Sequence, residues 1–169
     1  IALPLSLGYT SDCEMMNFVA EDAMTGDTIT ARLNAVLPEG LIAVRTYETE
    51  RKVKEICAAR FVITLDYDDG VPEDCGGALK QFYTNSPVYV MKKSKRGEKQ
   101  VDITPLIREI EIEEHEKCVK IMATLAAGNE SLNPEYMVRA LREQLLRLAP
   151  NDASFHRTAV LDNNLCDFA

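Results

Sequence analysis

The stretch Val101-Asp102-Ile103-Thr104-Pro105-Leu106-Ile107, taken together with the distant His156-Arg157-Thr158, decides the expected fold of the second half of this chain. Pro105 marks a turn within this stretch, since proline has no backbone N–H to offer a sheet. We therefore predict a strand, a proline turn, a second strand and, around His156, a closing strand. Neither segment contains an obvious catalytic device.

Side-chain alternation upstream extends this pattern. Phe61, Ile63 and Leu65 recur with a period of two, which predicts a strand with one apolar face. The further elements predicted here are a turn at 68–70, a helix opened by Pro72, a hairpin with strands at 87–91 and 100–103, a second hairpin with strands at 106–113 and 117–125, a helix from 133 to before Pro150, and a closing strand at 155–161.

The first third of the chain predicts a strand–helix–strand unit. Residues 13–21 and 41–47 suit strands, and between them an apolar stripe of helical spacing follows Thr25, whose hydroxyl can cap the helix. The charged run 48–55 is the best candidate for a domain boundary. The expected fold is α+β, with two ferredoxin-like (βαββαβ-type) units and mainly antiparallel sheets. Residues 1–52 would form the C-terminal half of an incomplete first unit, and 57–169 the second unit with an added basic hairpin.

An incomplete first unit has a consequence for assembly. Its apolar strand and helix faces should be covered by another copy of the chain, giving a homodimer, or by residues outside this sequence. The chain begins with Ile1 and looks like a fragment of a longer protein.

Composition and charge bound the class of protein. The chain has 169 residues, 46% hydrophobic and 27% charged, which is typical of a soluble globular protein. Neither a membrane-spanning segment nor a signal peptide is evident, so we expect a cytoplasmic protein. A net charge of −8 disfavours general binding to nucleic acids. The five cysteines include no C-x-x-C pair, so no zinc site, other metal, cofactor or local disulfide framework is indicated.

One local exception to the acidic charge is the tip of the predicted hairpin, where a protruding ribbon could follow a phosphate backbone. The alternative is a solvated hairpin end, or lysines that protect a sheet edge from aggregation. No aromatic residue interleaves with these charges, so no base-stacking platform is indicated. The candidate RNA-binding residues are Lys92, Lys93, Lys95, Arg96 and Lys99.

The two opening segments supply the other candidates. His156 could transfer protons near neutral pH, but no carboxylate or cysteine close in sequence assembles a triad with it. A hydrogen-bonded structural histidine, with Arg157 paired to an acid, is the favoured interpretation. Asp102 is expected to cap the turn before Pro105. Glu109, Glu111 and Glu113 form the solvent-exposed face of a strand or, alternatively, a surface that binds a basic partner. No catalytic residue is assigned.

The same segments carry a family resemblance. Asp102, Pro105, His156, Arg157 and Thr158 resemble the signature of the radical-SAM-linked family, small bacterial proteins of unknown function that are fused to, or encoded beside, cobalamin-binding-type radical SAM proteins. Residues 4–8 (Pro-Leu-Ser-Leu-Gly) and 33–41 resemble further segments of that family in the same order, so the resemblance covers essentially the whole chain.

The resemblance implies a radical SAM protein as partner. It also implies that a further strand and helix, with a polar motif, precede this sequence, and that the genes lie near those of ribonucleases and ribosomal proteins. The chain itself lacks the three closely spaced cysteines of a radical SAM cluster and cannot be that enzyme. We expect a non-catalytic accessory protein in RNA modification or processing. The alternatives are a stand-alone nucleic-acid-processing enzyme whose catalytic residues lie in the missing N-terminal part, and a purely structural dimerisation module.

Overall fold

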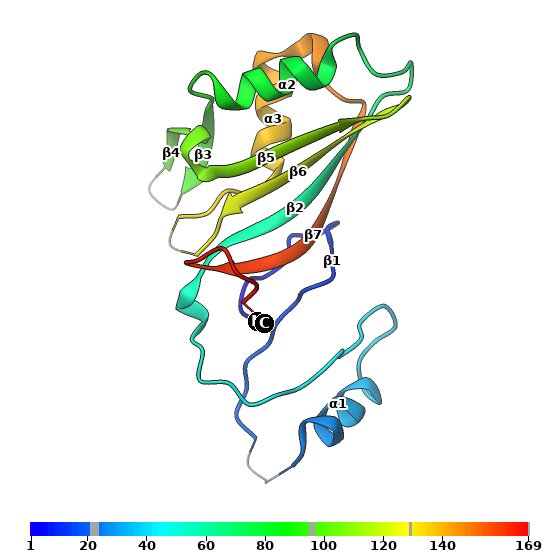
Figure 1. Ribbon diagram of the computed structural model, residues 1–169, viewed down its shortest axis with the longest axis vertical. Helices are drawn as coiled ribbons and strands as arrows, with labels where there is room; N and C mark the ends of the chain where they lie inside the picture. The colour runs from blue at the N-terminus through cyan, green and yellow to red at the C-terminus, as the bar shows by residue number, and fades with distance from the viewer. Residues whose placement is uncertain (21–23, 95–96, 129, 169) are drawn as a thin grey trace.

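The structure, a computed structural model, describes residues 1–20, 24–94, 97–128 and 130–168 and has an α+β fold (Figure 1). A five-stranded sheet has the order β1-β7-β2-β6-β5, and its strand pairs are antiparallel except for the parallel pair β1 and β7. The predicted α+β class with mainly antiparallel strands is thus confirmed. The strands are β1 (Thr10–Ser11), β2 (Ile56–Asp66), β3 (Tyr89–Ser94), β4 (Gly97–Asp102), β5 (Ile107–Glu114), β6 (Cys118–Ala126) and β7 (Asp152–Asp162), and the helices are α1 (Gly26–Asn34), α2 (Cys75–Thr84) and α3 (Glu135–Gln144).

The second half of the chain follows the predicted order of elements. Helix α2 connects β2 to a separate two-stranded sheet of β3 and β4, and α3 connects β6 to β7. Two helix boundaries differ from prediction. Helix α2 begins at Cys75, after a turn in which Cys75 N donates to Pro72 O at 3.2 Å, because Pro72 lies in the turn and not in the helix. Helix α3 ends at Gln144, and a 3-10 turn over Leu146–Leu148 precedes Pro150.

The core lies between the five-stranded sheet and helices α2 and α3. The predicted alternation in β2 is correct, since Phe61, Ile63 and Leu65 are buried and the last two are fully so. Tyr83 of α2 donates its hydroxyl to Met137 O of α3 at 2.9 Å, which joins the two helices inside the core. Each fully buried aliphatic side chain contributes about 1.5–3 kcal/mol, so this half of the chain holds the apolar burial that stabilises the protein.

Three β-bulges interrupt the ladders of the large sheet. The register shifts leave one residue without an opposite partner on each strand concerned: Cys57 on β2, Arg108 on β5 and Thr158 on β7. A bulge bends its strand and changes the direction of nearby side chains. Thr158, in the His156-Arg157-Thr158 segment, is the extra residue of β7 at its bulge.

The first third of the chain does not form the predicted sheet. The strands expected over 13–21 and 41–47 are wrong: residues 13–20 and 41–52, all described, contain no strand, while residue 21 lies outside the described part. The predicted helix is present as α1, and Thr25 Oγ1 accepts from Thr28 N at 3.3 Å as its cap. Segment 41–47 is held to α1 by side chains, with Asn34 bonded to the Ala43 backbone at 2.7 and 2.9 Å. No described strand of this chain lies beside it to complete a ladder.

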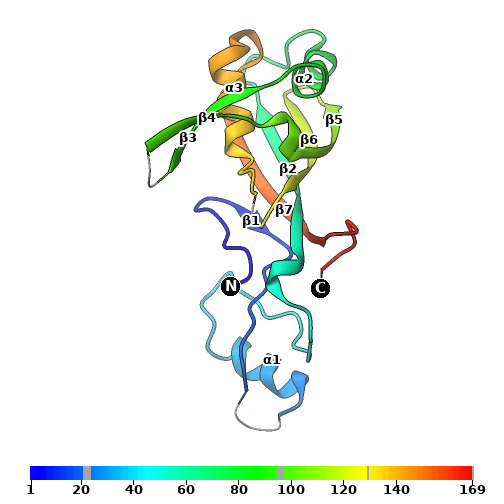
Figure 2. The same cartoon turned by 90° about the vertical axis from the view of Figure 1, so that its left-hand side faces the viewer.

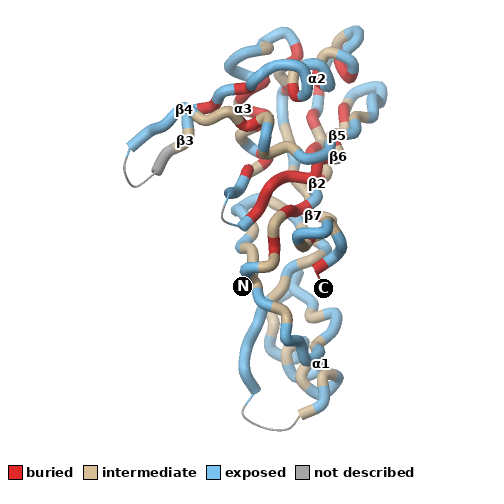
Figure 3. Tube along the Cα trace, turned by 60° about the vertical axis from the view of Figure 1, so that its left-hand side comes forward, coloured by how far each residue is buried: buried red, intermediate tan, exposed pale blue. Residues whose placement is uncertain are grey.

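This first third also has no core. None of the described residues before Ile56 is buried, and α1 lies far from the large sheet (Figures 2 and 3). The apolar stripe of α1 is therefore only partly covered. The large apolar side chains that remain exposed in this part are Ile1, Leu7, Met16, Phe18, Val19, Val36, Leu41, Ile42, Val44 and Tyr47.

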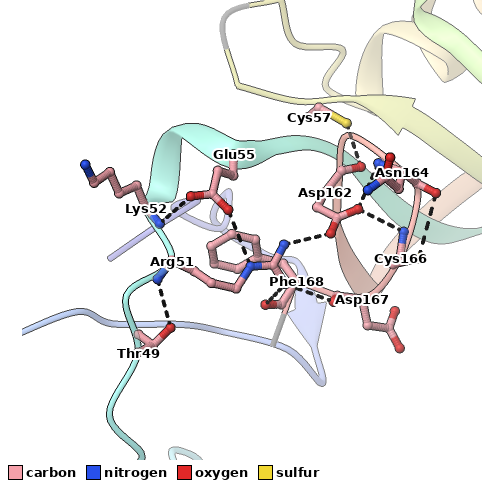
Figure 4. Close-up of polar contacts among 10 residues, drawn as sticks. All are labelled: Thr49, Arg51, Lys52, Glu55, Cys57, Asp162, Asn164, Cys166, Asp167 and Phe168. Atoms are coloured by element: carbon pink, nitrogen blue, oxygen red, sulfur yellow. Dashed lines mark hydrogen bonds and ion pairs between the residues drawn. The ribbon is translucent and has the colours of Figure 1, made fainter.

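The charged run 48–55 is not a free linker, because Arg51 fixes it to the end of the chain (Figure 4). Arg51 Nη2 donates to Asp162 Oδ2 at 2.7 Å, and Nη1 donates to Phe168 O at 2.8 Å. The guanidinium lies 4.4 Å from the centroid of the Phe168 ring, a cation–π distance. Glu55 adds a weaker contact at 3.5 Å. We call this group, Arg51 with Glu55, Asp162 and Phe168, the Arg51 latch.

In the part of the chain that the structure describes, no helix combines the length and apolar character needed to cross a membrane.

Candidate functional site

The signature segment 101–107 joins the small hairpin to the large sheet. Asp102 Oδ1 accepts hydrogen bonds from Thr104 N at 3.0 Å and from Val88 N at 3.1 Å, so Asp102 caps this turn as predicted. Ile103 is fully buried, and Pro105 lies in a short 3-10 helix that leads into β5. Capping by Asp102 and burial of Ile103 explain the conformation of this segment. They also place Arg108 at the start of β5.

The second signature segment lies where the N-terminal residues meet β7. His156 Nδ1 lies 2.7 Å from Thr10 Oγ1, and His156 Nε2 lies 2.8 Å from Asp12 Oδ2. Thr10 is directly opposite His156 in the parallel β1–β7 pair. The structure thus assembles a carboxylate–imidazole–hydroxyl chain, which we call the His156 relay. The His156 side chain is 35% exposed and that of Asp12 is 70% exposed, so the relay is open to solvent.

Arg157 is directed differently and is buried, at 2% exposure. It forms an ion pair with Glu14, and its Nη2 donates to Leu3 O at 2.8 Å. The predicted pairing of Arg157 to an acid is therefore correct. Next to it, Tyr9 stacks on Phe155 with ring centroids 4.5 Å apart. Together these contacts attach residues 1–15 to the sheet.

Burial and a hydrogen-bond network change the acidity of Tyr9. Its hydroxyl donates to Asn133 Oδ1 at 2.6 Å. Desolvation, followed by the charge of Glu135, raises the pKa of Tyr9 to about 12, so the phenol stays protonated at physiological pH. Through this hydrogen bond Tyr9 attaches the N-terminal residues to the segment before α3.

The His156 relay can assist one kind of chemistry, removal of a proton from a hydroxyl. A carboxylate on one ring nitrogen fixes the orientation of an imidazole, and the other nitrogen can then accept a proton. Sequence inspection missed Asp12 and Thr10, because they lie 144 and 146 residues from His156. Only the parallel pairing of β1 with β7 brings them to His156.

The predicted basic hairpin is present, and Figure 2 shows it projecting from the molecule. Lys99 is exposed on β4, whereas Lys92 donates from Nζ to Ser131 O at 2.7 Å and lies 5.3 Å from the Tyr136 ring centroid. Desolvation lowers the pKa of Lys92. Lys93 belongs to β3, and Lys95 and Arg96 lie outside the described residues.

Helix α3 holds the base of this hairpin. Arg139 donates to Met91 O, and Gln144 Nε2 donates to Tyr89 O at 2.6 Å. Both acceptors are backbone groups of β3, so α3 covers part of that strand's edge. The hairpin is therefore a fixed projection whose orientation is set by α3.

The described residues contain no cluster of three or more side chains suited to hold a metal ion. Cys13, Cys57, Cys75, Cys118 and Cys166 are all free thiols. Burial raises the pKa of Cys75 and of Cys13, so neither is an activated nucleophile.

Comparison with known proteins identifies one family. Residues 1–134 match the family described as an uncharacterized protein conserved in bacteria (DUF2344). Neither a curated protein nor a solved structure matches the chain. The description of the family states no activity and no partner. Since the match spans well over half of the sequence, the chain belongs to this bacterial family of uncharacterised proteins.

Proposed function

We propose that this protein is a cytoplasmic accessory protein that binds a larger protein through its first 52 residues and has no catalytic activity of its own. The observation that carries the proposal is the complete lack of buried residues among the described residues before Ile56. Contiguous exposed apolar side chains are costly in water and mark interaction surfaces. In this segment Ile42 is 80% exposed and Val44 is 83% exposed.

The proposed partner is a radical SAM protein. This choice follows from the family resemblance of the two signature segments, since members of that family are fused to or encoded beside such enzymes. The chain has five cysteines without the close spacing of a cluster motif, so it would depend on its partner for radical chemistry.

We infer further that residues 56–162 form one ferredoxin-like unit. The strand order β7-β2-β6-β5 and the succession β2-α2-β5-β6-α3-β7 are those of a βαββαβ fold, with the β3–β4 hairpin inserted after α2. The inferred boundary between this unit and the first segment is near residues 53–56. The Arg51 latch would hold the two parts together.

RNA is the proposed substrate of the complex. Support comes from the projecting hairpin, whose lysines contrast with a net charge of −8 for the whole chain. Positive charges on a ribbon can contact successive phosphates. Because Lys92 is engaged by Ser131 and Tyr136, Lys99 is the described hairpin lysine best placed to contact RNA.

The partner proposal is tested by co-purification. The chain should be co-expressed with a cobalamin-binding-type radical SAM protein, the proposed partner, and the complex isolated through a tag on that partner. Ile42→Glu and Val44→Glu should each abolish co-purification, because each introduces a charge into the proposed interface. Leu146→Glu is the matched control, since Leu146 is a 76% exposed apolar residue on the other half of the chain.

Three results would contradict this proposal. The first is a wild-type protein that does not co-purify with the radical SAM protein, and the second is equal recovery of all three variants. The third is a stable homodimer in light scattering that Ile42→Glu and Val44→Glu convert to monomer, which would instead support the dimerisation module.

A second candidate function is favoured by the His156 relay. We infer an acyl-transfer activity in which His156 Nδ1 takes the proton of Thr10 Oγ1 while Thr10 attacks an activated ester, and Asp12 holds the imidazole. The leaving alcohol receives the proton from the imidazolium, and the acyl group stays on Thr10 until water removes it.

Incubation with p-nitrophenyl acetate tests this candidate. Acetyl-Thr10 should accumulate in mass spectra of the wild type, should be absent in Thr10→Val and should decrease strongly in His156→Gln. An equal rate in His156→Gln, or acetylation spread over surface lysines without Thr10, would exclude the activity and leave the relay as an attachment of β1 to β7.

A further inference from the structure

A polar cleft lies at one end of the large sheet, where β2 and β5 begin and β6 ends. Its volume is about 460 Å³, within the range of small-molecule sites. The side chains that give it chemical character are Lys54, Cys57, Arg108, Glu130 and Asn163, and Pro105 of the signature segment contributes to its wall.

Two of the three β-bulges form this cleft. Cys57 is the extra residue of β2 and Arg108 is the extra residue of β5, and both strands are paired to β6. The β5 bulge interrupts the pairing with β6, and the β2 bulge interrupts the pairing with β7. Cys57 O accepts from Ala127 N at 2.9 Å just beyond β6, so both extra residues lie near the end of β6. Bulges occur often beside functional sites because they change the direction of a side chain and interrupt the ladder.

Arg108 is held in place but keeps donors available. Its Nη2 donates to Cys57 O at 3.2 Å, across the cleft from one bulge to the other. A guanidinium has five N–H donors in a planar fork, and no other bond of this side chain is present among the described residues. The remaining donors suit two oxygens of one oxyanion.

The Cys57 side chain is already occupied. Its Sγ donates to Asp162 O at 2.9 Å, beside the Arg51 latch (Figure 4). This bond fixes the wall of the cleft to the end of β7. The thiol therefore lines the wall of the cleft. Binding of a ligand is left to the cations Lys54 and Arg108.

The charge of the cleft is opposite to that of the chain. Two cations, Lys54 and Arg108, face a single carboxylate, Glu130, whereas the whole chain carries −8. The Lys54 side chain is exposed, so its ammonium is open to a ligand. Asn163 adds an amide that can donate to a sugar or base.

We propose that this cleft binds the phosphate monoester of a nucleotide, with Arg108 and Lys54 on the phosphate oxygens. The ligand is either a free mononucleotide or the 5′-terminal nucleotide of an RNA, since both present the same dianionic group. The cleft lies outside the basic hairpin and the apolar N-terminal segment. The inference thus stands on its own geometry, and only the RNA source rests on the proposed function.

The test measures binding of four probes to the full chain by calorimetry: uridine 5′-monophosphate, uridine, and an RNA hexamer with a 5′-phosphate or a 5′-hydroxyl. The wild type should bind the phosphorylated member of at least one pair and not its unphosphorylated counterpart. Arg108→Gln and Lys54→Gln should each weaken that binding about tenfold, the loss expected for one or two charge-assisted hydrogen bonds. Arg60→Gln, which removes an exposed arginine outside the cleft, should leave it unchanged.

Because Arg108 also bonds to Cys57, thermal unfolding of Arg108→Gln should be measured, and Lys54→Gln provides the variant without such a bond. Arg108→Lys should keep only part of the affinity, because it retains the charge without the fork. Binding of the hexamer alone identifies an RNA end as ligand, and binding of the mononucleotide identifies a free nucleotide. No binding of either phosphorylated probe, equal binding of both members of each pair, or equal affinity of the cleft variants and wild type would each overturn the proposal.

Discussion

Arg51 and Asp162 are 111 residues apart in the chain, yet Arg51 Nη2 donates to Asp162 Oδ2 at 2.7 Å. This bond joins the segment before β2 to the last residue of β7. The hydrogen bond to Asp162 raises the pKa of Arg51, and the pKa of Asp162 is lowered by the Asn164 backbone N–H and then by Arg51. The charged state of both groups is therefore favoured in the folded protein.

Replacing Arg51 should weaken the attachment of the segment before β2 to the C-terminal residues. Arg51→Gln removes the ion pair and the interaction with the Phe168 ring, while Lys52→Gln removes a neighbouring exposed charge without a described side-chain ion pair. We expect a lower Tm for Arg51→Gln and faster hydrogen exchange in residues 163–168, with Lys52→Gln unchanged. Identical exchange in the two variants would show that the latch does not hold the C-terminal loop.

The latch should also give a pH-dependent contribution to stability. The folded pKa values of Asp162 and Glu55 are both lowered, Asp162 mainly by the Asn164 backbone N–H and Glu55 mainly by that of Lys52. Their contribution is complete above the unfolded carboxyl pKa of about 4 and is lost as the pH falls through the folded values. Asp162→Asn should thus be less stable than wild type at neutral pH, and the difference should shrink below about pH 4. Urea unfolding at several pH values measures this, and a constant difference would refute it.

The two halves of the chain should respond differently to the same substitution. Ile63→Ala removes a fully buried side chain and should lower the free energy of unfolding by about 2–5 kcal/mol. Ile42→Ala changes a side chain that is 80% exposed, and a shift within about 0.5 kcal/mol is expected. Denaturant unfolding of both variants decides between a free and a packed N-terminal segment. A loss for Ile42→Ala similar to that for Ile63→Ala would contradict the exposed state of this segment.

Glu14 should matter because its partner is buried. Arg157 is 2% exposed, and Glu14→Gln would leave its guanidinium without a counter-charge. Because Glu14 is 36% exposed, we expect a cost of about 1–2 kcal/mol, below the value for a fully buried pair. Asp12→Asn is the control, since Asp12 is 70% exposed and should change stability little. Equal effects of the two variants would show that burial of Arg157 does not set the cost.

RNA binding through the hairpin should depend steeply on salt. If the five basic residues bind phosphates, replacing all five with Gln should flatten the slope of log affinity against log salt by about 0.7–0.9 for each phosphate that is no longer neutralised. Lys99→Gln alone should flatten this slope by the amount expected for about one phosphate contact. Lys92→Gln should flatten it less, because Lys92 is bonded to Ser131. Lys80→Gln, at an exposed lysine of α2, is the control. Filter binding of the full-length protein measures the slopes, and an unchanged slope in the five-residue variant would remove the hairpin from RNA binding.

The local elements of the second half follow from the order of the residues alone. Alternation at Phe61, Ile63 and Leu65 indicates a strand because the side chains of a strand point to opposite faces. The Asp102–Thr104 bond and the α1 cap are also local, since each joins groups only two or three residues apart. Such features depend on neighbouring residues and are therefore readable from the chain.

The remaining features depend on how distant segments meet. Apolar residues at 13–21 and 41–47 have the composition of strands, but a strand requires a neighbouring ladder, and no described strand lies beside them. Likewise, no local pattern shows that Asp12 is bonded to His156 or that Arg108 lies opposite Cys57, because those pairs arise from strand order and from bulges. Local patterns set which elements form, and hydrogen bonding between distant segments sets which side chains meet.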